Sequence, residues 1–267
     1  MNLKMTKTTD NQTHFSADRY AKADIAITVK NLVKKFGNFV ANDHLNFEVY
    51  KGEIFGFLGA NGAGKTTAIR ILCGLSKPTS GELNIAGFDG YKDTEKIKKS
   101  IGYMSQKFSL YEDLTVVENI RFYGGIYGLT DKEIKERTQN LIDNLKLSDV
   151  KDKLIKDLPL GWRQKLAFSV AILHNPSIVF LDEPTGGVDP ITRRQFWDMI
   201  YDAANNGITV FVTTHYMDEA EYCNRVSIMV DGKIAALDTP ESLMKTYKAE
   251  NMEEVFLKLA RGVNNDE

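Results

Sequence analysis

Hydrophobic and polar residues alternate in two segments near the start of the chain. "DIAITVKNL" begins at Asp24 and "HLNFEVYKGE" begins at His44, and apolar residues recur at every second position in both. This period is typical of a strand with one buried face, and two neighbouring strands of this kind favour an antiparallel sheet. The pattern therefore predicts a half-exposed β-sheet in this part of the chain.

Three later segments are short and largely apolar. "IFGFLG" begins at Ile54, "SIVFLDEP" at Ser177 and "ITVFVTTH" at Ile208. Continuous apolar runs of this length are typical of parallel strands buried on both faces. "VSIMVDGKIAAL" predicts instead a hairpin with Asp231 and Gly232 at its turn, because this pair accepts the backbone that such turns need.

Helical spacing dominates elsewhere. "TTAIRILCGL" follows the first apolar run, while "TVVENIRFYGGIYGL" and "DKEIKERTQNLIDNLKL" lie between Phe108 and Lys156. The sequence contains no internal repeat. It predicts an α/β core over residues 25–259, interrupted by a helical subdomain at approximately 107–175. Residues 1–24 and 260–267 are polar, so we expect a flexible tail at each end.

Composition narrows the class of protein. The 267 residues are 43% hydrophobic and 26% charged, as in an ordinary soluble globular protein. A net charge of −2 gives no support to nucleic-acid binding, and we expect no nucleic-acid partner. Cys73 and Cys223 are too few for a disulfide framework or a zinc site, which favours a reduced, cytosolic compartment. No apolar run reaches the ~18–20 residues that span a bilayer, and no secretory signal is present.

The stretch "GANGAGKT" fits the phosphate-loop pattern G-x-x-x-x-G-K-[ST] between a predicted strand and a predicted helix. Its glycines let backbone N–H groups point at phosphate oxygens, and the helix adds the positive end of its dipole. Lys65 would reach the β- and γ-phosphates, and the Thr66 hydroxyl would bind Mg²⁺. The alternative, a glycine-rich turn with a chance lysine, is disfavoured by the flanking elements. The predicted nucleotide-binding residues are Gly59, Ala60, Asn61, Gly62, Ala63, Gly64, Lys65, Thr66 and Thr67.

Two acids end the apolar run "IVFLDEP". Ligands of open α/β sheets collect at the carboxyl ends of the strands, so Asp182 is placed to hold Mg²⁺. Glu183 is placed to orient or deprotonate an attacking water. His215 also follows a buried strand, and we expect it at the same sheet edge. The alternatives are acids that cap a strand and a structural histidine.

Together these residues make the chain similar to the nucleotide-binding subunit of ABC transporters. "YMSQKFSLYEDLTVVENI" resembles the Q-loop of that family, "TGGVDP" its D-loop and "TTHYMDEAE" its switch region. The resemblance implies that Gln106 reaches Mg²⁺ and the attacking water, that His215 contacts the γ-phosphate, and that Asp189 lies at a dimer seam. Phe36 in "KKFGNFVA" would stack on adenine, the alternative being a core aromatic. The implied fold is α/β, a RecA-like P-loop NTPase core with a parallel sheet, an antiparallel β subdomain and an inserted α-helical subdomain.

The family's signature, L-S-G-G-Q, has a variant counterpart here. Two nucleotide-binding subunits of the family pair head-to-tail, and each signature faces the ATP bound to its partner. Pro159 stands where the family has a serine, and it has neither a hydroxyl nor an N–H group. Losing a hydrogen bond to a charged group costs ~1.5–3 kcal/mol, so we expect a weakened closed dimer but not its loss. The predicted signature residues are Leu158, Pro159, Leu160, Gly161 and Trp162.

The resemblance implies a subunit that binds and hydrolyses ATP with Mg²⁺ and powers a transporter. The form "LPLGW" resembles the variant found with ABC-2-type export permeases, including multidrug exporters. The implied partners are a second nucleotide-binding subunit, identical or different, and separate transmembrane permease subunits, which would hold this chain at the cytoplasmic face of the membrane. Two alternatives remain open: a slow-turnover regulatory subunit with a conventional partner, and a soluble ABC ATPase without a transport role.

Overall fold

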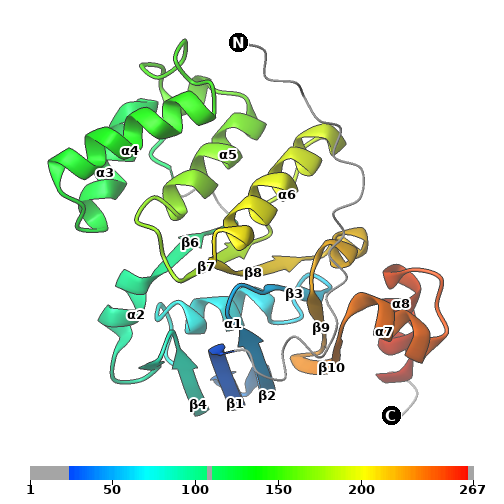
Figure 1. Ribbon diagram of the computed structural model, residues 1–267. Coiled ribbons are helices and arrows are strands. Elements are labelled where there is room, and N and C mark those ends of the chain that lie inside the picture. The colour runs from blue at the N-terminus through cyan, green and yellow to red at the C-terminus, as the bar shows by residue number, and fades with distance from the viewer. Residues whose placement is uncertain (1–23, 107–109, 264–267) are drawn as a thin grey trace.

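The computed structural model describes residues 24–106 and 110–263. A six-stranded sheet forms its centre, in the order β10-β9-β3-β8-β7-β6 (Figure 1). β3 pairs in parallel with β8 and β9, and β7 pairs in parallel with β6 and β8, so the carboxyl ends of these five strands lie at the same edge of the sheet. The strands are β3 (Ile54–Gly59), β6 (Ile101–Met104), β7 (Ile178–Asp182), β8 (Thr209–Thr214), β9 (Arg225–Val230) and β10 (Lys233–Asp238).

The central strands are buried on both faces, as their continuous apolar runs predict. In β7 every residue is buried, and successive side chains enter different cores. Phe180 packs in the core between the two sheets, whereas Val179 and Leu181 pack in the core shared with the helices. This alternation explains why the strand shows no polar face in the sequence.

A second, antiparallel sheet has the order β2-β1-β4-β5. Its strands are β1 (Ile25–Phe36), β2 (Phe39–Tyr50), β4 (Ser80–Ile85) and β5 (Phe88–Asp89), and α2 (Thr94–Ser100) follows them. The helix α1 (Lys65–Leu72) shares a core with both sheets, and this core contains a cluster of phenylalanine rings centred on Phe211. The antiparallel sheet, the parallel sheet and the hairpin at Asp231 and Gly232 are confirmed.

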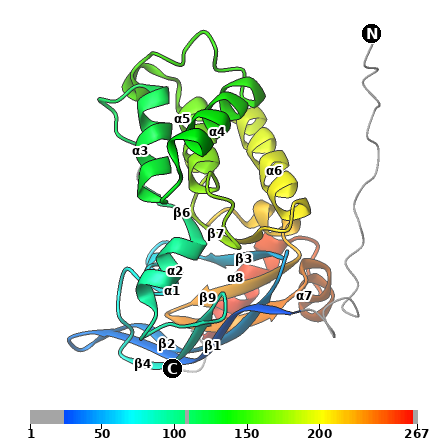
Figure 2. The same ribbon diagram turned by 60° about the vertical axis from the view of Figure 1, so that its left-hand side comes forward.

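The helices between β6 and β7 form a lobe above the central sheet (Figure 2). They are α3 (Val116–Ile126), α4 (Asp131–Asn144), the 3-10 turn η2 (Ile155–Asp157) and α5 (Leu160–Ala171). Thr115 with Glu118, and Thr130 with Glu133, form complete capping boxes that satisfy the first N–H groups of α3 and α4. Phe108, named in the sequence prediction, lies outside the described residues.

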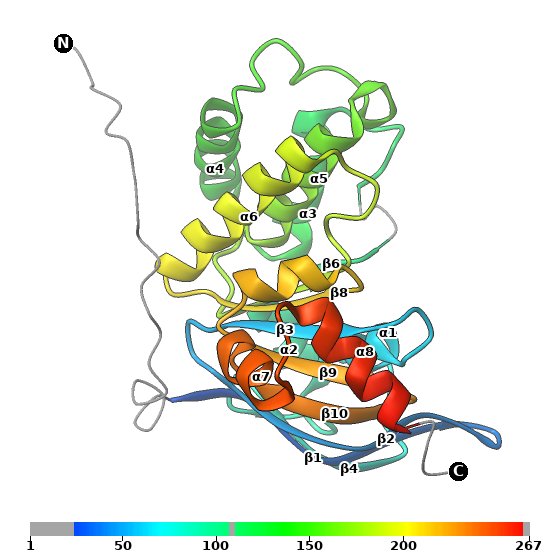
Figure 3. The same ribbon diagram turned by 90° about the vertical axis from the view of Figure 1, so that its right-hand side faces the viewer.

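The last part of the described chain packs beside β9 and β10 (Figure 3). It contains the 3-10 segment η3 (Met217–Tyr222), α7 (Pro240–Tyr247) and α8 (Met252–Val263). The helix α6 (Pro190–Asn205), between β7 and β8, packs against β8 instead. Helix α8 extends to Val263, beyond Leu259, where the sequence predicts the end of the domain. Met252 and Val255 of this helix lie in the core. Residues 1–23 and 264–267, most of the two expected tails, lie outside the described ranges.

Within the described part of the chain, no helix is both long and apolar enough to cross a membrane. The longest, α6, has 16 residues.

Gly102 in β6 lies close to the backbone at the end of α5, and this contact can be tested by its effect on stability. A Cβ at Gly102 would lie 2.2 Å from the carbonyl oxygen of Ala171. We therefore expect Gly102→Ala to lower the free energy of unfolding by about 1–3 kcal/mol, because the two elements must separate. Urea unfolding measures this change.

Gly125 in α3 is the matched control, because nothing lies within 4 Å of the Cβ it would gain. Gly125→Ala is expected to leave stability unchanged or raise it by about 0.5–1 kcal/mol through helix propensity. Equal unfolding midpoints for the two variants would contradict the proposed packing at Gly102.

Candidate nucleotide-binding site

The phosphate loop joins the carboxyl end of β3 to the first turn of α1. Gly64, the residue before the helix, has a left-handed backbone with φ of 101°. A Cβ there would lie 2.3 Å from the carbonyl oxygen of Ala41 on β2. Glycine is therefore required at this position for two reasons: the left-handed backbone angle and the close approach of β2. This packing fixes the loop against the antiparallel sheet.

Lys65 is the first residue of α1, and its side chain is only 4% exposed. Its Nζ donates hydrogen bonds to the carbonyl oxygens of Gly59 (2.8 Å) and Ala60 (3.1 Å). The same atom lies 3.4 Å from Oε1 of Glu183. Burial lowers the pKa of Lys65, and the nearby Glu183 carboxylate opposes this shift. The loop thus holds a desolvated cation where phosphate oxygens would meet it.

Asp182 ends β7 beside the phosphate loop. Its Oδ1 accepts hydrogen bonds from the hydroxyls of Thr213 on β8 (2.8 Å) and Thr66 on α1 (3.3 Å). Burial raises the pKa of Asp182, while these two hydrogen bonds lower it. A carboxylate beside a hydroxyl is the oxygen ligand set that Mg²⁺ prefers, so these residues fit the expected metal.

The other predicted catalytic residues lie around the carboxylate of Glu183. Nε2 of Gln106 donates a hydrogen bond to Oε2 (2.9 Å), and Nδ1 of His215 lies 3.1 Å from the same oxygen. The backbone of Glu183 has a φ of 50°, a left-handed conformation that L-residues other than glycine seldom adopt. Its N–H bonds to the carbonyl and hydroxyl oxygens of Thr213 (3.1 and 3.0 Å), and these bonds hold the strained turn.

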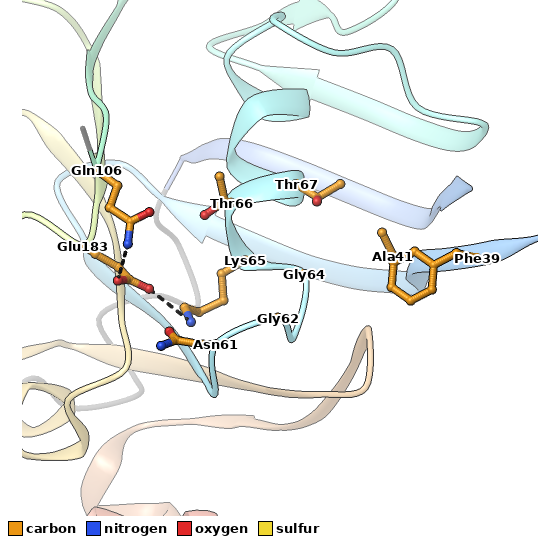
Figure 4. A pocket seen from close by; sticks show the side chains of 10 residues that line it. All are labelled: Phe39, Ala41, Asn61, Gly62, Gly64, Lys65, Thr66, Thr67, Gln106 and Glu183. Carbon is orange, nitrogen blue, oxygen red and sulfur yellow. Dashed lines mark hydrogen bonds and ion pairs between the residues drawn. The ribbon is translucent and has the colours of Figure 1, made fainter. Parts of the chain in front are cut away.

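A cavity of about 270 Å³ opens over this group (Figure 4). Figure 4 shows Lys65 between Glu183 on one side and the residues of the loop on the other. Within the loop, Ala63 is buried, and Gly59 and Ala60 contribute the carbonyl groups described above. The residues that line the cavity are Phe39, Ala41, Asn61, Gly62, Gly64, Lys65, Thr66, Thr67, Gln106 and Glu183.

The aromatic wall of the cavity differs from the sequence prediction. Phe39, at the start of β2, lines the cavity with Ala41, while Phe36 does not. Phe36 is 55% exposed at the end of β1, and Nζ of Lys34 lies 4.7 Å from the centre of its ring. Only a two-residue turn separates the two aromatics. Phe39 and Ala41 share a strand face because they are two residues apart.

The five signature residues stand at the start of α5, and none of them lines the cavity. Leu158 is buried, whereas Leu160 and Trp162 are each 37% exposed. The carbonyl oxygen of Pro159 accepts hydrogen bonds from the N–H groups of Trp162 (3.0 Å) and Arg163 (3.2 Å), so proline closes the first turn.

Asp189 caps α6 in this structure. Its Oδ1 accepts hydrogen bonds from the N–H groups of Ile191 and Thr192, both at 3.0 Å. These bonds and the Thr192 hydroxyl lower the pKa of Asp189. A Cβ at Gly161 would lie 2.6 Å from Cγ2 of Thr192, so the start of α5 packs directly on this cap.

Three contributors to the site were missed in the sequence. The sequence prediction names Phe36 rather than Phe39, and it places Thr213 only in a buried strand. Gln164 of α5 donates a hydrogen bond to the carbonyl oxygen of Gly186 (3.1 Å), which ties the signature helix to the loop after Glu183. A polar residue at the end of an apolar run is the available signal for Thr213, since buried polar groups need partners. Gln164 lies between Arg163 and Lys165, so the sequence carries no such signal for it.

A parallel sheet with a phosphate loop, a magnesium-compatible Asp182 and a shielded Glu183 defines a P-loop nucleotide-binding protein, and the predicted fold class is confirmed. The sequence profile described as "ABC transporter" matches residues 42–186. The chain therefore belongs to the ABC transporter family, as its motifs predict.

Known proteins agree with this assignment. The chain is 46% identical over 242 residues to the probable multidrug ABC transporter ATP-binding protein YbhF of Escherichia coli, covering 88% of this chain and 42% of that protein. It thus spans less than half the length of that relative. It is 34% identical to the Nod factor export ATP-binding protein I of Cupriavidus metallidurans, covering 86% of this chain and 76% of that protein. A dimeric, post-hydrolysis ATP-binding cassette bound to ADP and Pi superposes with a TM-score of 0.72 at 26% identity, covering 80% and 98% of the two chains.

The two aromatics of the β1–β2 hairpin give a test of base recognition. We expect Phe39→Ala to weaken ADP binding by about tenfold, because stacking a base on an aromatic ring contributes on the order of 1–3 kcal/mol. Phe36→Ala, the matched control on the same hairpin, should leave the affinity near that of the wild type. Isothermal titration calorimetry with ADP measures both. If Phe36→Ala weakened ADP binding more than Phe39→Ala, Phe36 would be the stacking residue.

The raised pKa of Asp182 gives a second test. Its folded-state pKa lies above the unfolded value, so the residue favours folding at low pH and opposes it as pH rises through the folded pKa. At pH 7 without metal, Asp182→Asn is therefore expected to melt at or above the wild-type temperature. Adding Mg²⁺ with ADP should raise the melting temperature of the wild type more than that of the variant. An equal rise in both proteins would exclude Asp182 as a metal ligand.

Proposed function

We propose that this chain is an ATP-hydrolysing subunit that powers an ABC transporter of the export type. The observation that carries the proposal is the contact of Gln106, His215 and Lys65 with the carboxylate of Glu183 at the mouth of the phosphate loop. A site meant only to hold a nucleotide needs the loop and Lys65. It does not need a carboxylate that is 9% exposed and flanked by an amide and an imidazole.

The chemistry follows from these positions. The N–H groups of the loop and Lys65 bind the phosphates of ATP, and Lys65 then exchanges its contact with Glu183 for the γ-phosphate. Glu183 orients and deprotonates the attacking water, and Gln106 holds that water in place. His215 contacts the γ-phosphate. Mg²⁺ on Thr66 and Asp182 would neutralise phosphate charge when bound.

We propose a head-to-tail dimer in which the start of α5 completes the partner's site. The exposed side chains of Leu160 and Trp162 support this, as does Ile191, which is 72% exposed in the first turn of α6. Isolated apolar groups on a surface are common, but three at the adjoining starts of α5 and α6 favour a covered surface. A cassette that is similar to this chain is dimeric with ADP and Pi bound, which supports the formation of a dimer.

The lobe of helices is the proposed contact with a permease at the cytoplasmic face of the membrane. Tyr111 and Phe122 are 50% and 42% exposed, with ring centres 4.8 Å apart, and Ile126 is 60% exposed. Leu110, next to Tyr111 in the chain, is buried and takes no part in this surface. The names of the multidrug and Nod factor export relatives favour export as the direction of transport.

Pro159 favours a second candidate function, a slow-turnover subunit paired with a conventional partner. Proline at the N-cap of α5 gives no side-chain hydrogen bond and has no N–H group to offer a partner's phosphate. In a dimer of two such chains both composite sites would be weakened, whereas in a mixed dimer only one would be.

Steady-state ATPase rates of the wild type, Glu183→Gln and Pro159→Ser separate these candidates. We expect Glu183→Gln to lower the rate by on the order of 10²-fold or more, because it removes the general base and keeps the shape of the side chain. Pro159→Ser should raise the rate or tighten ATP-dependent dimerisation by about tenfold, because it restores a hydroxyl.

A wild-type rate equal to that of Glu183→Gln would rule out hydrolysis and leave the regulatory subunit as the better reading. Copurification of this chain with a multi-spanning membrane protein tests the transport role separately from the chemistry.

A further inference from the structure

Glu219 in η3 is a carboxylate with no solvent exposure, and it lies four residues after His215. Its Oε1 accepts a short hydrogen bond from the Thr185 hydroxyl (2.6 Å). Nε of Arg193 lies 3.6 Å from the same oxygen. Removing a charge from water costs several kcal/mol unless it is paired and hydrogen-bonded, so this side chain has a structural or functional reason to be buried.

The partners of Glu219 belong to the two segments that frame the candidate site. Thr185 lies two residues after Glu183, in the loop that leaves β7. Arg193 lies in α6, four residues after the cap Asp189. Oε1 of Glu219 therefore contacts both the loop that carries the proposed base, Glu183, and helix α6, which Asp189 caps.

Arg193 also reaches back to the residues beside His215. Its Cζ lies 4.2 Å from the centre of the Tyr216 ring, and the Tyr216 and His215 rings are 4.2 Å apart. A guanidinium over an aromatic ring is an attractive contact, and it limits where the ring can move. Nη1 of Arg193 lies 3.4 Å from Asp218, which adds a weaker, exposed contact.

We propose that Glu219 is a positioning residue for hydrolysis, which sets His215 against Glu183 through Thr185 and Arg193. The inference rests on the function proposed above. Thr185 holds the far end of the Glu183 turn, and Arg193 holds the Tyr216 ring. Glu219 joins the two, so the 3.1 Å approach of His215 to Glu183 depends on its charge.

Glu219→Gln tests the charge with little change in shape. The glutamine can still accept the hydrogen bond from Thr185 but no longer pairs with Arg193. We expect kcat for ATP to fall about tenfold with KM unchanged, because the phosphate loop is untouched. Glu221→Gln is the matched control, since Glu221 lies in the same 3-10 segment and is exposed. It should retain the wild-type kcat.

Two further variants keep the test independent of folding defects. Thr185→Val removes the hydroxyl and should lower kcat as Glu219→Gln does, while Thr185→Ser keeps the hydroxyl and should restore it. If Glu219 acts through His215, then Glu219→Gln should have no further effect on kcat in a His215→Ala background. An equal fall in both backgrounds, or a normal kcat in Glu219→Gln, overturns the proposal.

A spectroscopic readout covers the case in which the chain hydrolyses no ATP. The chain has four histidines, so the ring resonance of His215 can be assigned by its loss in His215→Ala. We expect this resonance to shift in Glu219→Gln and to stay in place in Glu221→Gln. An unmoved resonance overturns the positioning role. Failure of the proposed ATPase function would appear differently, as a wild-type rate no higher than that of Glu183→Gln.

Discussion

The rest of the site depends on one desolvated cation. Nζ of Lys65 has almost no contact with water, so protein oxygens must surround it, and here they come from Gly59, Ala60 and Glu183. Parallel pairing of β7 with β8, and of β8 with β3, brings the end of the phosphate loop and the proposed base to the same edge. Nucleotide phosphates would compete for the same cation, so binding can release Glu183 without any large movement of the sheet.

Close packing links this edge to the start of α5. Gly161 lies against Thr192, Gln164 bonds to the backbone of Gly186, and Gly102 lies against the end of the same helix. Each contact leaves little space for a larger or displaced group. The signature helix, the loop after Glu183 and the strand that leads to Gln106 are thus connected by packing as well as by sequence.

The sequence was informative wherever the chemistry depends on neighbouring residues in the chain. The glycines and Lys65 follow a local pattern, and the position of Asp182 follows from the apolar run before it. The sequence alone does not point to Phe39, because which ring faces the cavity depends on how the hairpin docks against the loop. The motif "TTHYMDEAE" contains Glu219 and Glu221, and nothing in the sequence distinguishes the buried carboxylate of Glu219 from the exposed Glu221. Asp189 followed by proline did carry a readable signal for a helix cap, and it was interpreted only as part of a dimer seam.

The left-handed backbone of Glu183 has a consequence for protein engineering. A side chain with a Cβ costs roughly 1–2 kcal/mol in that conformation, and glycine or asparagine would relieve part of the cost. A selection for heat resistance alone would therefore favour replacing this residue, and the stabilised molecules would lack the proposed base. The same backbone angle thus affects both the stability of the protein and its turnover. Variants selected for stability should therefore also be screened for turnover, and the reverse.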